Sequence, residues 1–203
     1  MDNAALTACD IWLFLLNGNF GLTFKFILGK LPLQRDEWFV DAPKTGFGGV
    51  CGRYFFKLSY KGFLRLVDPK MRPLFADMFI AYRELLAVLL AFQVFGKLAP
   101  NCFIRLNSDN TSTVAWVNKG RCSKMPGFLI LSAIESFKFN FGLKVKAIYI
   151  KSRHNNSADT LSRNQTPSWL VSKGVRLQIN IPEIVQLLDN PLPFWKPKTK
   201  TPF

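Results

Sequence analysis

The chain has 203 residues, of which 49% are hydrophobic and 14% aromatic. This composition excludes an intrinsically disordered protein, and the length excludes two full-sized domains. Lysine and arginine total 27 against 13 acidic residues, a formal net charge of +14 that predicts a polyanionic partner. Nucleic acid is favoured over a membrane surface because the basic residues are dispersed, and a basic surface without a dedicated ligand is the alternative.

Cysteine and histidine usage excludes two kinds of stabilised fold. The 4 cysteines lie far apart and the chain has 1 histidine, so neither a zinc site nor a disulfide framework is predicted. Reduced thiols predict an intracellular protein, in the cytoplasm or the nucleus. The apolar run at 11–16 is too short to span a bilayer, and Asp2 and Asp10 argue against a signal peptide, so we expect no membrane contact.

The first strands of the domain follow an alternating apolar pattern. Residues 38–41 predict a buried strand that ends at Asp41, and residues 46–52 predict a turn and a glycine-rich second strand. Residues 54–67 continue the strand pattern through a hairpin at 59–62. We therefore predict three antiparallel strands.

The strongest helix is predicted over residues 78–95, with Asp77 as a candidate N-cap and Gly96 as a candidate stop. It is apolar nearly all round, which predicts a helix sandwiched between layers. Glu84 is the exception, because an ionised carboxylate among apolar neighbours is costly unless it is paired or binds a cation. An arginine partner, or a place at the edge of the buried face, is the alternative to a cation.

A second acidic residue follows the next strand. Residues 102–108 predict a strand that delivers Asp109 at its end, where open α/β sheets place their ligands. A short helix is predicted at 114–118, so Asp109 has an alternative role as its cap, which Asn110 or Thr111 could fill equally well.

The remaining pattern is a helix over 128–139, a strand over 143–150 and a short helix that opens at Asp159. The two ends of the chain carry no predicted active centre. Residues 1–36 hold apolar patches that we expect to pack on the main domain or on a neighbour, and residues 166–203 are predicted to form a basic, proline-rich, extended tail.

Four acids thus lie on four elements that converge on one sheet: Asp41, Glu84, Asp109 and Asp159. Such a set suits a centre of two Mg²⁺ ions, where one cation generates hydroxide and the other stabilises the leaving oxygen of a phosphodiester. Oxygen ligands select hard cations, with Mn²⁺ as a substitute, in agreement with the absence of a Cys/His pattern.

The order Asp, Glu, Asp, Asp on strand, helix, strand and helix resembles that of ribonuclease H. The strings at 40–49, 83–88, 107–110 and 154–163 resemble the ribonuclease H domain of retrotransposon reverse transcriptases. The nearest group is that of the DIRS type, which encodes a tyrosine recombinase, and residues 10–18 resemble its connection between polymerase thumb and ribonuclease H. The resemblance covers residues 8–165 or so.

This resemblance implies an α/β fold, in which a mixed five-stranded sheet of three antiparallel and two parallel strands is flanked by helices. It implies a ribonuclease H-like domain at 37–165, preceded at 1–36 by a remnant of the polymerase thumb or connection. The implied activity is Mg²⁺-dependent cleavage of the RNA strand of RNA/DNA hybrids, with the four acids as metal ligands and a polymerase domain as a partner.

Other functions stay open at this point. A catalytically silent module that binds nucleic acid or docks on a polymerase is the main alternative. A DDE transposase would need its glutamate last, and a proofreading exonuclease would need an acid where Pro43 stands. Tyr149 occupies the place of the histidine of cellular and retroviral enzymes, so His154 is interpreted as structural or substrate-facing, with assistance in proton transfer as the alternative.

The predicted contacts to nucleic acid are basic or amide side chains, each with a solvated surface role as its alternative. They are Lys119, Arg121, Lys124, Lys151, Arg153, Arg163, Asn110 and Asn155. The other acids are expected at the surface or at helix caps, and they include Asp36, Glu37, Asp77, Glu135 and Asp189.

Overall fold

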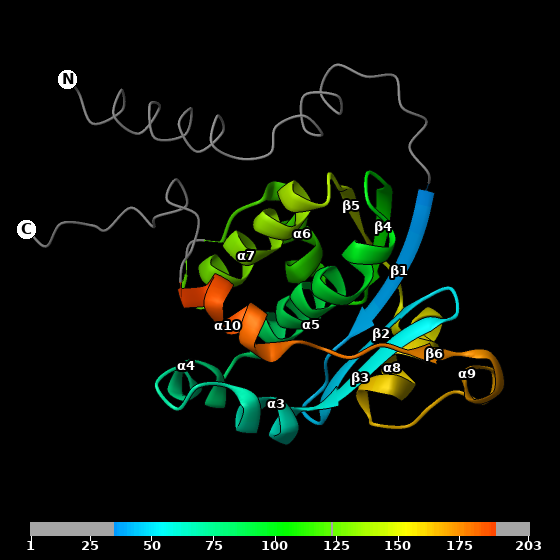
Figure 1. The fold of residues 1–203 in the computed structure, drawn as a ribbon, viewed down its shortest axis with the longest axis horizontal. Helices are drawn as coiled ribbons and strands as arrows, with labels where there is room; N and C mark the ends of the chain where they lie inside the picture. Colours follow the sequence, from blue (N-terminus) through cyan, green and yellow to red (C-terminus); the bar gives the residue numbers. More distant parts are fainter. Residues whose placement is uncertain (1–34, 123, 190–203) are drawn as a thin grey trace, which may run out of the picture.

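The computed structural model of the chain describes residues 35–122 and 124–189 (Figure 1). Nearly all of the predicted polymerase-derived segment at 1–36, and the tail beyond residue 189, lie outside these residues. No helix in the described part of the chain is long and apolar enough to cross a membrane.

A mixed sheet forms the centre of the protein, in the order β5-β4-β1-β2-β3-β6. β1, β2 and β3 are antiparallel, whereas β4 and β5 run parallel to β1. The strands are β1 (Arg35–Asp41), β2 (Gly46–Cys51), β3 (Tyr54–Ser59), β4 (Phe103–Ser108), β5 (Lys144–Tyr149) and β6 (Val175–Arg176). The predicted α/β class and mixed sheet are confirmed, but the count of five strands is wrong. The sixth, β6, pairs with β3 and has only two residues, too few to show alternation.

Helices cover both faces of this sheet (Figure 1). One face carries α5, α6 and α7, and α8 packs on the other across β1, β2 and β3. The α-helices are α3 (Tyr60–Leu66), α4 (Arg72–Ala76), α5 (Ile80–Phe95), α6 (Thr111–Lys119), α7 (Gly127–Asn140), α8 (Asn156–Ser162), α9 (Ser168–Lys173) and α10 (Ile181–Asp189). Two 3₁₀ turns, η1 (Gly96–Leu98) and η2 (Ser152–His154), complete the elements.

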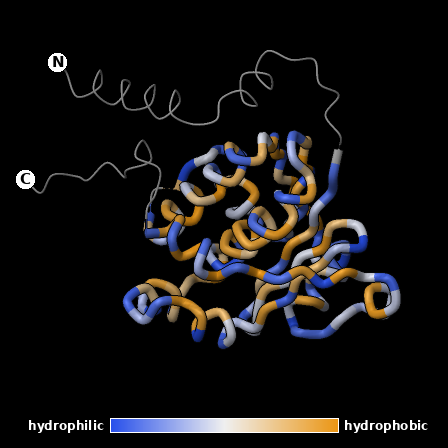
Figure 2. The backbone as a smooth tube through the Cα atoms, viewed as in Figure 1, coloured by the Kyte–Doolittle hydropathy of each residue, from blue (hydrophilic) through white to orange (hydrophobic). Residues whose placement is uncertain are grey.

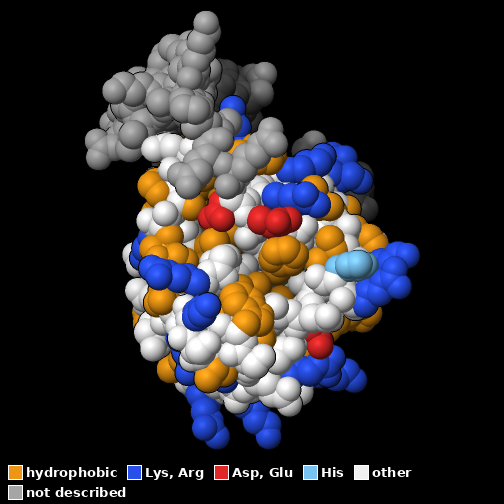
Figure 3. Space-filling view, turned by 90° about the vertical axis from the view of Figure 1, so that its right-hand side faces the viewer, with side chains coloured by type: hydrophobic (Ala, Val, Ile, Leu, Met, Phe, Trp, Pro, Cys, Tyr) orange, Lys and Arg blue, Asp and Glu red, His pale blue; other side chains and the backbone are white. Residues whose placement is uncertain are grey.

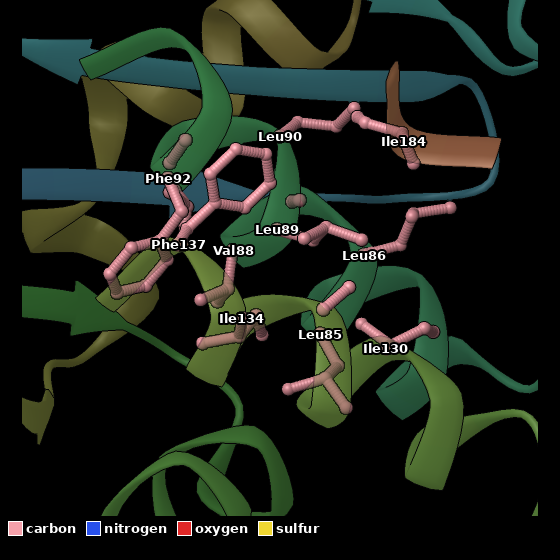
Figure 4. Packing of buried hydrophobic residues seen from close by; sticks show 14 of the residues in the cluster. Leu85, Leu86, Val88, Leu89, Leu90, Phe92, Ile130, Ile134, Phe137 and Ile184 are labelled. Atoms are coloured by element: carbon pink, nitrogen blue, oxygen red, sulfur yellow. The ribbon is translucent and has the colours of Figure 1, made fainter. Parts of the chain in front are cut away.

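The main core lies between α5, α7 and the sheet. The hydrophobic segments concentrate inside this layer in Figure 2, while turns at the periphery are hydrophilic. In Figure 4 the side chains of α5 meet those of α7 and of Ile184 in α10. Trp38 of β1 adds an edge-to-face contact with Phe92 at 5.2 Å between ring centroids. Each fully buried side chain of this size stabilises the fold by about 1.5–3 kcal/mol, which explains why α5 is almost entirely apolar.

Three details differ from the sequence prediction. Residues 60–66 form α3 instead of a strand, because the Ser59 side chain accepts from Gly62 N at 3.0 Å and caps a helix that buries Tyr60 and Phe63. Asp77 does not cap α5, which begins after Phe79 without a side-chain cap. The tail prediction fails for residues 168–189, which form α9, β6 and α10.

The last helix α10 packs on the core through Ile181, Ile184 and Leu188, whose spacing is helical. Gln93 of α5 fastens its start by accepting from Asn180 N at 3.0 Å. The C-terminal part of the described chain is therefore integral to the domain.

Candidate metal centre

Three carboxylates from three elements meet at one end of the sheet. Asp41 ends β1, Asp109 follows β4, and Glu84 lies in the second turn of α5. Each offers one oxygen, and these oxygens lie within 4.8 Å of one another. β1 and β4 are parallel neighbours, so their carboxyl ends meet at the same edge, and α5 crosses above it. This convergence is the one expected for three of the four predicted metal ligands.

Glu84 occupies the most costly position of the three. It is 5% exposed, and its Oε1 accepts from Ala42 N at 3.1 Å. Burial, together with the charges of Asp41 and Asp109, raises the pKa of Glu84 to about 9, against the opposing effect of the Ala42 bond. Its other oxygen, Oε2, is buried and has no hydrogen-bond partner among the residues described.

Glu84 has no arginine partner among the described residues, so this alternative is wrong. Arg83, its neighbour in α5, lies over the ring of Tyr60 with 4.2 Å from the guanidinium carbon to the ring centroid. In the described part of the chain, no ion pair involves Glu84. A buried carboxylate oxygen without a partner, beside two further carboxylates, fits the ligand set of a hard cation.

Asp41 is equally buried but has a donor. Its Oδ2 accepts from the hydroxyl of Ser162 at 2.6 Å. Burial raises the pKa of Asp41 to about 6, whereas the Ser162 bond opposes that rise. The charges of Asp109 and Asp159 also raise this pKa, and that of Arg163 lowers it, so the four charged groups share one electrostatic environment.

Asp109 is half-buried, and its Oδ2 accepts from the hydroxyl of Ser152 at 2.6 Å. The alternative role as a helix cap is wrong for Asp109. The Asn110 side chain caps α6 by accepting from Thr113 N at 3.0 Å. Asn110, predicted as a nucleic-acid contact, therefore caps the helix with its side-chain oxygen. The carboxylate of Asp109 is part of the acid group instead.

Asp159, the predicted fourth ligand, does not belong to the group of three. It lies in the first turn of α8, as predicted, and its side chain is 40% exposed. Arg163 holds it through an ion pair of 2.8 Å between Nη2 and Oδ1, at i and i+4 of the helix. Ser162 nevertheless links it to the group, because the hydroxyl of Ser162 donates to Asp41 Oδ2 at 2.6 Å and lies 2.7 Å from the carbonyl oxygen of Asp159.

Small and polar residues bring α8 close to the sheet. A Cβ added to Gly48 of β2 would collide with the backbone nitrogen of Ser162, so glycine permits this approach. Asn155, at 1% exposure, donates from Nδ2 to the carbonyl of Val40 at 2.8 Å. Asn155 therefore links the start of α8 to β1. Because it is buried, it does not lie on the surface as a nucleic-acid contact would.

The predicted basic contacts all lie on the surface. The exposed residues are Lys119, Arg121, Lys124, Lys151, Arg153 and Arg163. His154 is exposed too, and its Nε2 accepts from Arg153 Nε at 3.1 Å. It is not a member of the acid group.

An aromatic hollow between the start of α5 and α6 was not predicted. The Trp116 hollow, of about 590 Å³, is lined by Phe79, Tyr82, Ser112, Trp116, Lys124 and Met125. The rings of Tyr82 and Trp116 stack at 5.2 Å, and Phe79 is 73% exposed. The prediction of a helix apolar all round concealed this feature, because Tyr82 in the first turn of α5, and Phe79 just before the helix, line the hollow instead of the core.

Comparison of the chain with protein-family models, curated proteins and solved structures gave no match. The functional argument therefore depends on the geometry of the site.

Proposed function

We propose that the chain is a Mg²⁺-dependent endoribonuclease of the ribonuclease H type that cleaves the RNA strand of RNA/DNA hybrids. One observation carries the proposal: three carboxylates from β1, α5 and the end of β4 converge, and one of their oxygens, Glu84 Oε2, is buried with no partner in the described chain. A buried carboxyl with an unpaired oxygen costs the fold stability. A cation bound by that oxygen would compensate for this cost.

In this proposal Asp41, Glu84 and Asp109 hold the cations, and Mn²⁺ can replace Mg²⁺. Bound Mg²⁺ supplies an activated water and stabilisation of the leaving oxygen of the phosphodiester. Asp159 joins from α8 as the fourth ligand when Arg163 releases it, which requires only that an exposed ion pair exchange partners. Ser162 and Ser152 orient the carboxylates of Asp41 and Asp109 through the bonds described above.

The surface at the Trp116 hollow supports a nucleic-acid substrate. Lys124 lines the Trp116 hollow, and Lys119, the last residue of α6, and Arg121 lie in the sequence between Trp116 and Lys124. Exposed aromatic rings offer apolar surface to sugars, while the lysines and the arginine meet phosphates. The order of three antiparallel strands followed by two parallel ones supports a ribonuclease H-like fold within the larger sheet, and hence the domain of a retroelement reverse transcriptase.

The test compares labelled RNA/DNA hybrid, single-stranded RNA and duplex DNA as substrates, with and without Mg²⁺. We expect cleavage of the hybrid alone, only with Mg²⁺, and its loss in Asp109→Asn. Asp77→Asn, at an exposed acid outside the group, is the matched control and should leave cleavage unchanged. Hybrid cleavage by Asp109→Asn would refute the assignment.

The same experiment separates the second candidate function, a silent module that binds nucleic acid or docks on a polymerase domain. The engagement of Asp159 by Arg163 favours it, because the fourth ligand is then withheld. Binding of the hybrid without Mg²⁺-dependent cleavage would select this function.

A further inference from the structure

A second hollow lies on the α8 side of the sheet. The Trp169 hollow, of about 560 Å³, has an apolar floor and a polar rim, and its lining includes Asp36, Glu37, Phe39, Val50, His154 and Trp169. Figure 3 shows the face that bears it, where apolar side chains lie beside acidic side chains and the histidine. Its size falls within the range of about 300–1,000 Å³ that small-molecule sites occupy.

The floor of this hollow presents an aromatic ring on a fixed helix. Leu170 of α9 is buried against Val50 and Leu161, which anchors the helix to the sheet. Its neighbour Trp169 is left 47% exposed at the hollow. An exposed tryptophan on an anchored helix is a stacking surface for a planar ring.

The rim carries opposite charges on its two sides. Glu37 of β1 forms one side, in a chain whose net charge is +14, whereas the carboxylate of Asp36 accepts from Trp38 Nε1 and Cys51 Sγ. Among the described residues, both donors to Glu37, Asn107 and Arg105, bond to its Oε1, so Oε2 remains to accept from a ligand. A carboxylate beside a planar binding surface suits the hydroxyl groups of a ribose.

The other side of the rim is basic. His154 lines the hollow, and Arg153 donates to its Nε2, which places a guanidinium at this side and leaves the proton of a neutral imidazole on Nδ1. These donors suit a phosphate. A basic peptide would fit the carboxylate of Glu37 but would meet the histidine and arginine opposite, so the dipolar rim disfavours it.

We propose that the Trp169 hollow binds an unpaired ribonucleotide, with its base on Trp169, its ribose at Glu37 and its phosphate toward His154 and Arg153. The source is either a free nucleotide or an unpaired residue of an RNA strand. The acidic rim and the metal centre lie at opposite ends of β1, so this site does not depend on the proposed cleavage.

The test is calorimetric titration in the presence of a chelator with adenosine 5′-monophosphate, its 2′-deoxy counterpart and short single-stranded oligoadenylate. We expect the ribonucleotide to bind about tenfold more tightly than the deoxyribonucleotide, since one hydrogen bond to a carboxylate is lost. Trp169→Leu should weaken binding about tenfold or more. Val171→Ser, at a 72% exposed position of the same helix, is the control and should bind as the parent does.

Two further variants assign the contacts. Glu37→Gln should remove the preference for ribose, and Asp109→Asn should retain full nucleotide binding even where cleavage is lost. Binding of oligoadenylate but not of the free nucleotide would assign the hollow to an unpaired residue of a strand, and binding of both would assign it to free nucleotides as well. Unchanged binding by Trp169→Leu, equal affinity for ribose and deoxyribose, or no binding of any of the three probes would overturn the proposal.

Discussion

Glu84→Gln is expected to favour the folded, metal-free protein more at pH 7 than at pH 5, by about 2–3 kcal/mol in the free energy of unfolding. The reason lies in the folded-state pKa of Glu84, which burial and two neighbouring carboxylates raise from 4.5 to about 9. Because the folded-state pKa is raised, the contribution of this carboxyl to the free energy of unfolding is greatest below about pH 4.5. It is lost progressively as the pH rises toward 9.

The size of the effect follows from the same values. Each pH unit above 4.5 costs the folded state about 1.4 kcal/mol, so the penalty is about 3 kcal/mol at pH 7 and about 0.7 kcal/mol at pH 5. Glutamine removes this penalty while its oxygen still accepts from Ala42 N. The amide nitrogen takes the place of the protonated oxygen and carries two N–H donors instead of one O–H, so one further buried donor lacks a partner at a cost of about 1–3 kcal/mol. This cost is the same at both pH values, so it leaves the difference between them unchanged.

The assay is urea unfolding at pH 5 and pH 7 in the presence of a chelator. Asp77→Asn, at an exposed acid, is the control and should show no comparable dependence on pH. Added Mg²⁺ should stabilise the parent protein and not Glu84→Gln, because a cation bound only by the folded state stabilises it by mass action. An equal effect of the substitution at both pH values would refute the reasoning.

Three smaller predictions concern the site, the core and a helix end. Ser162→Ala removes the donor that lowers the pKa of Asp41, so the pH midpoint of Mg²⁺ binding, followed by calorimetry, should rise by roughly one unit; an unchanged midpoint would contradict this role. Phe92→Ala opens a cavity beside Trp38 and should cost about 3–5 kcal/mol in urea unfolding. Asn110→Ala removes the cap of α6 and should cost about 1 kcal/mol in the same assay.

The acids could be placed from the sequence because strand ends and helical burial follow from residue patterns. Asp41 and Asp109 each close an apolar run, and parallel strands bring such ends together. Glu84 stands out because an ionised carboxylate within an apolar helix is costly to bury unless it is paired or binds a cation. The partner of Asp159 depends instead on rotamers, which a sequence pattern does not specify.

The helices α3 and α10 were not predicted, because the local sequence patterns there indicated other conformations and tertiary packing decided between them. α10 carries a helical apolar spacing, but Pro182 near its start resembled a break, although proline is well tolerated in the first turn of a helix. α3 depends on the cap at Ser59, in a stretch whose aromatic residues also suit a strand. In both cases the same residues fit two conformations, and packing on the main core decides between them.

Burial across the acids is graded, and this gradient links stability to the proposed chemistry. Glu84 and Asp41 are 5% exposed, Asp109 is half-buried, and the side chain of Asp159 is 40% exposed. On the proposed function, a cation enters from the side of Asp159 and must displace the proton that burial retains on Glu84. Metal affinity must then increase with pH, and the energy that burial of Glu84 costs the fold is recovered when the cation binds. The destabilisation of the metal-free protein and its stabilisation by a bound cation thus have one origin, the buried carboxyl of Glu84.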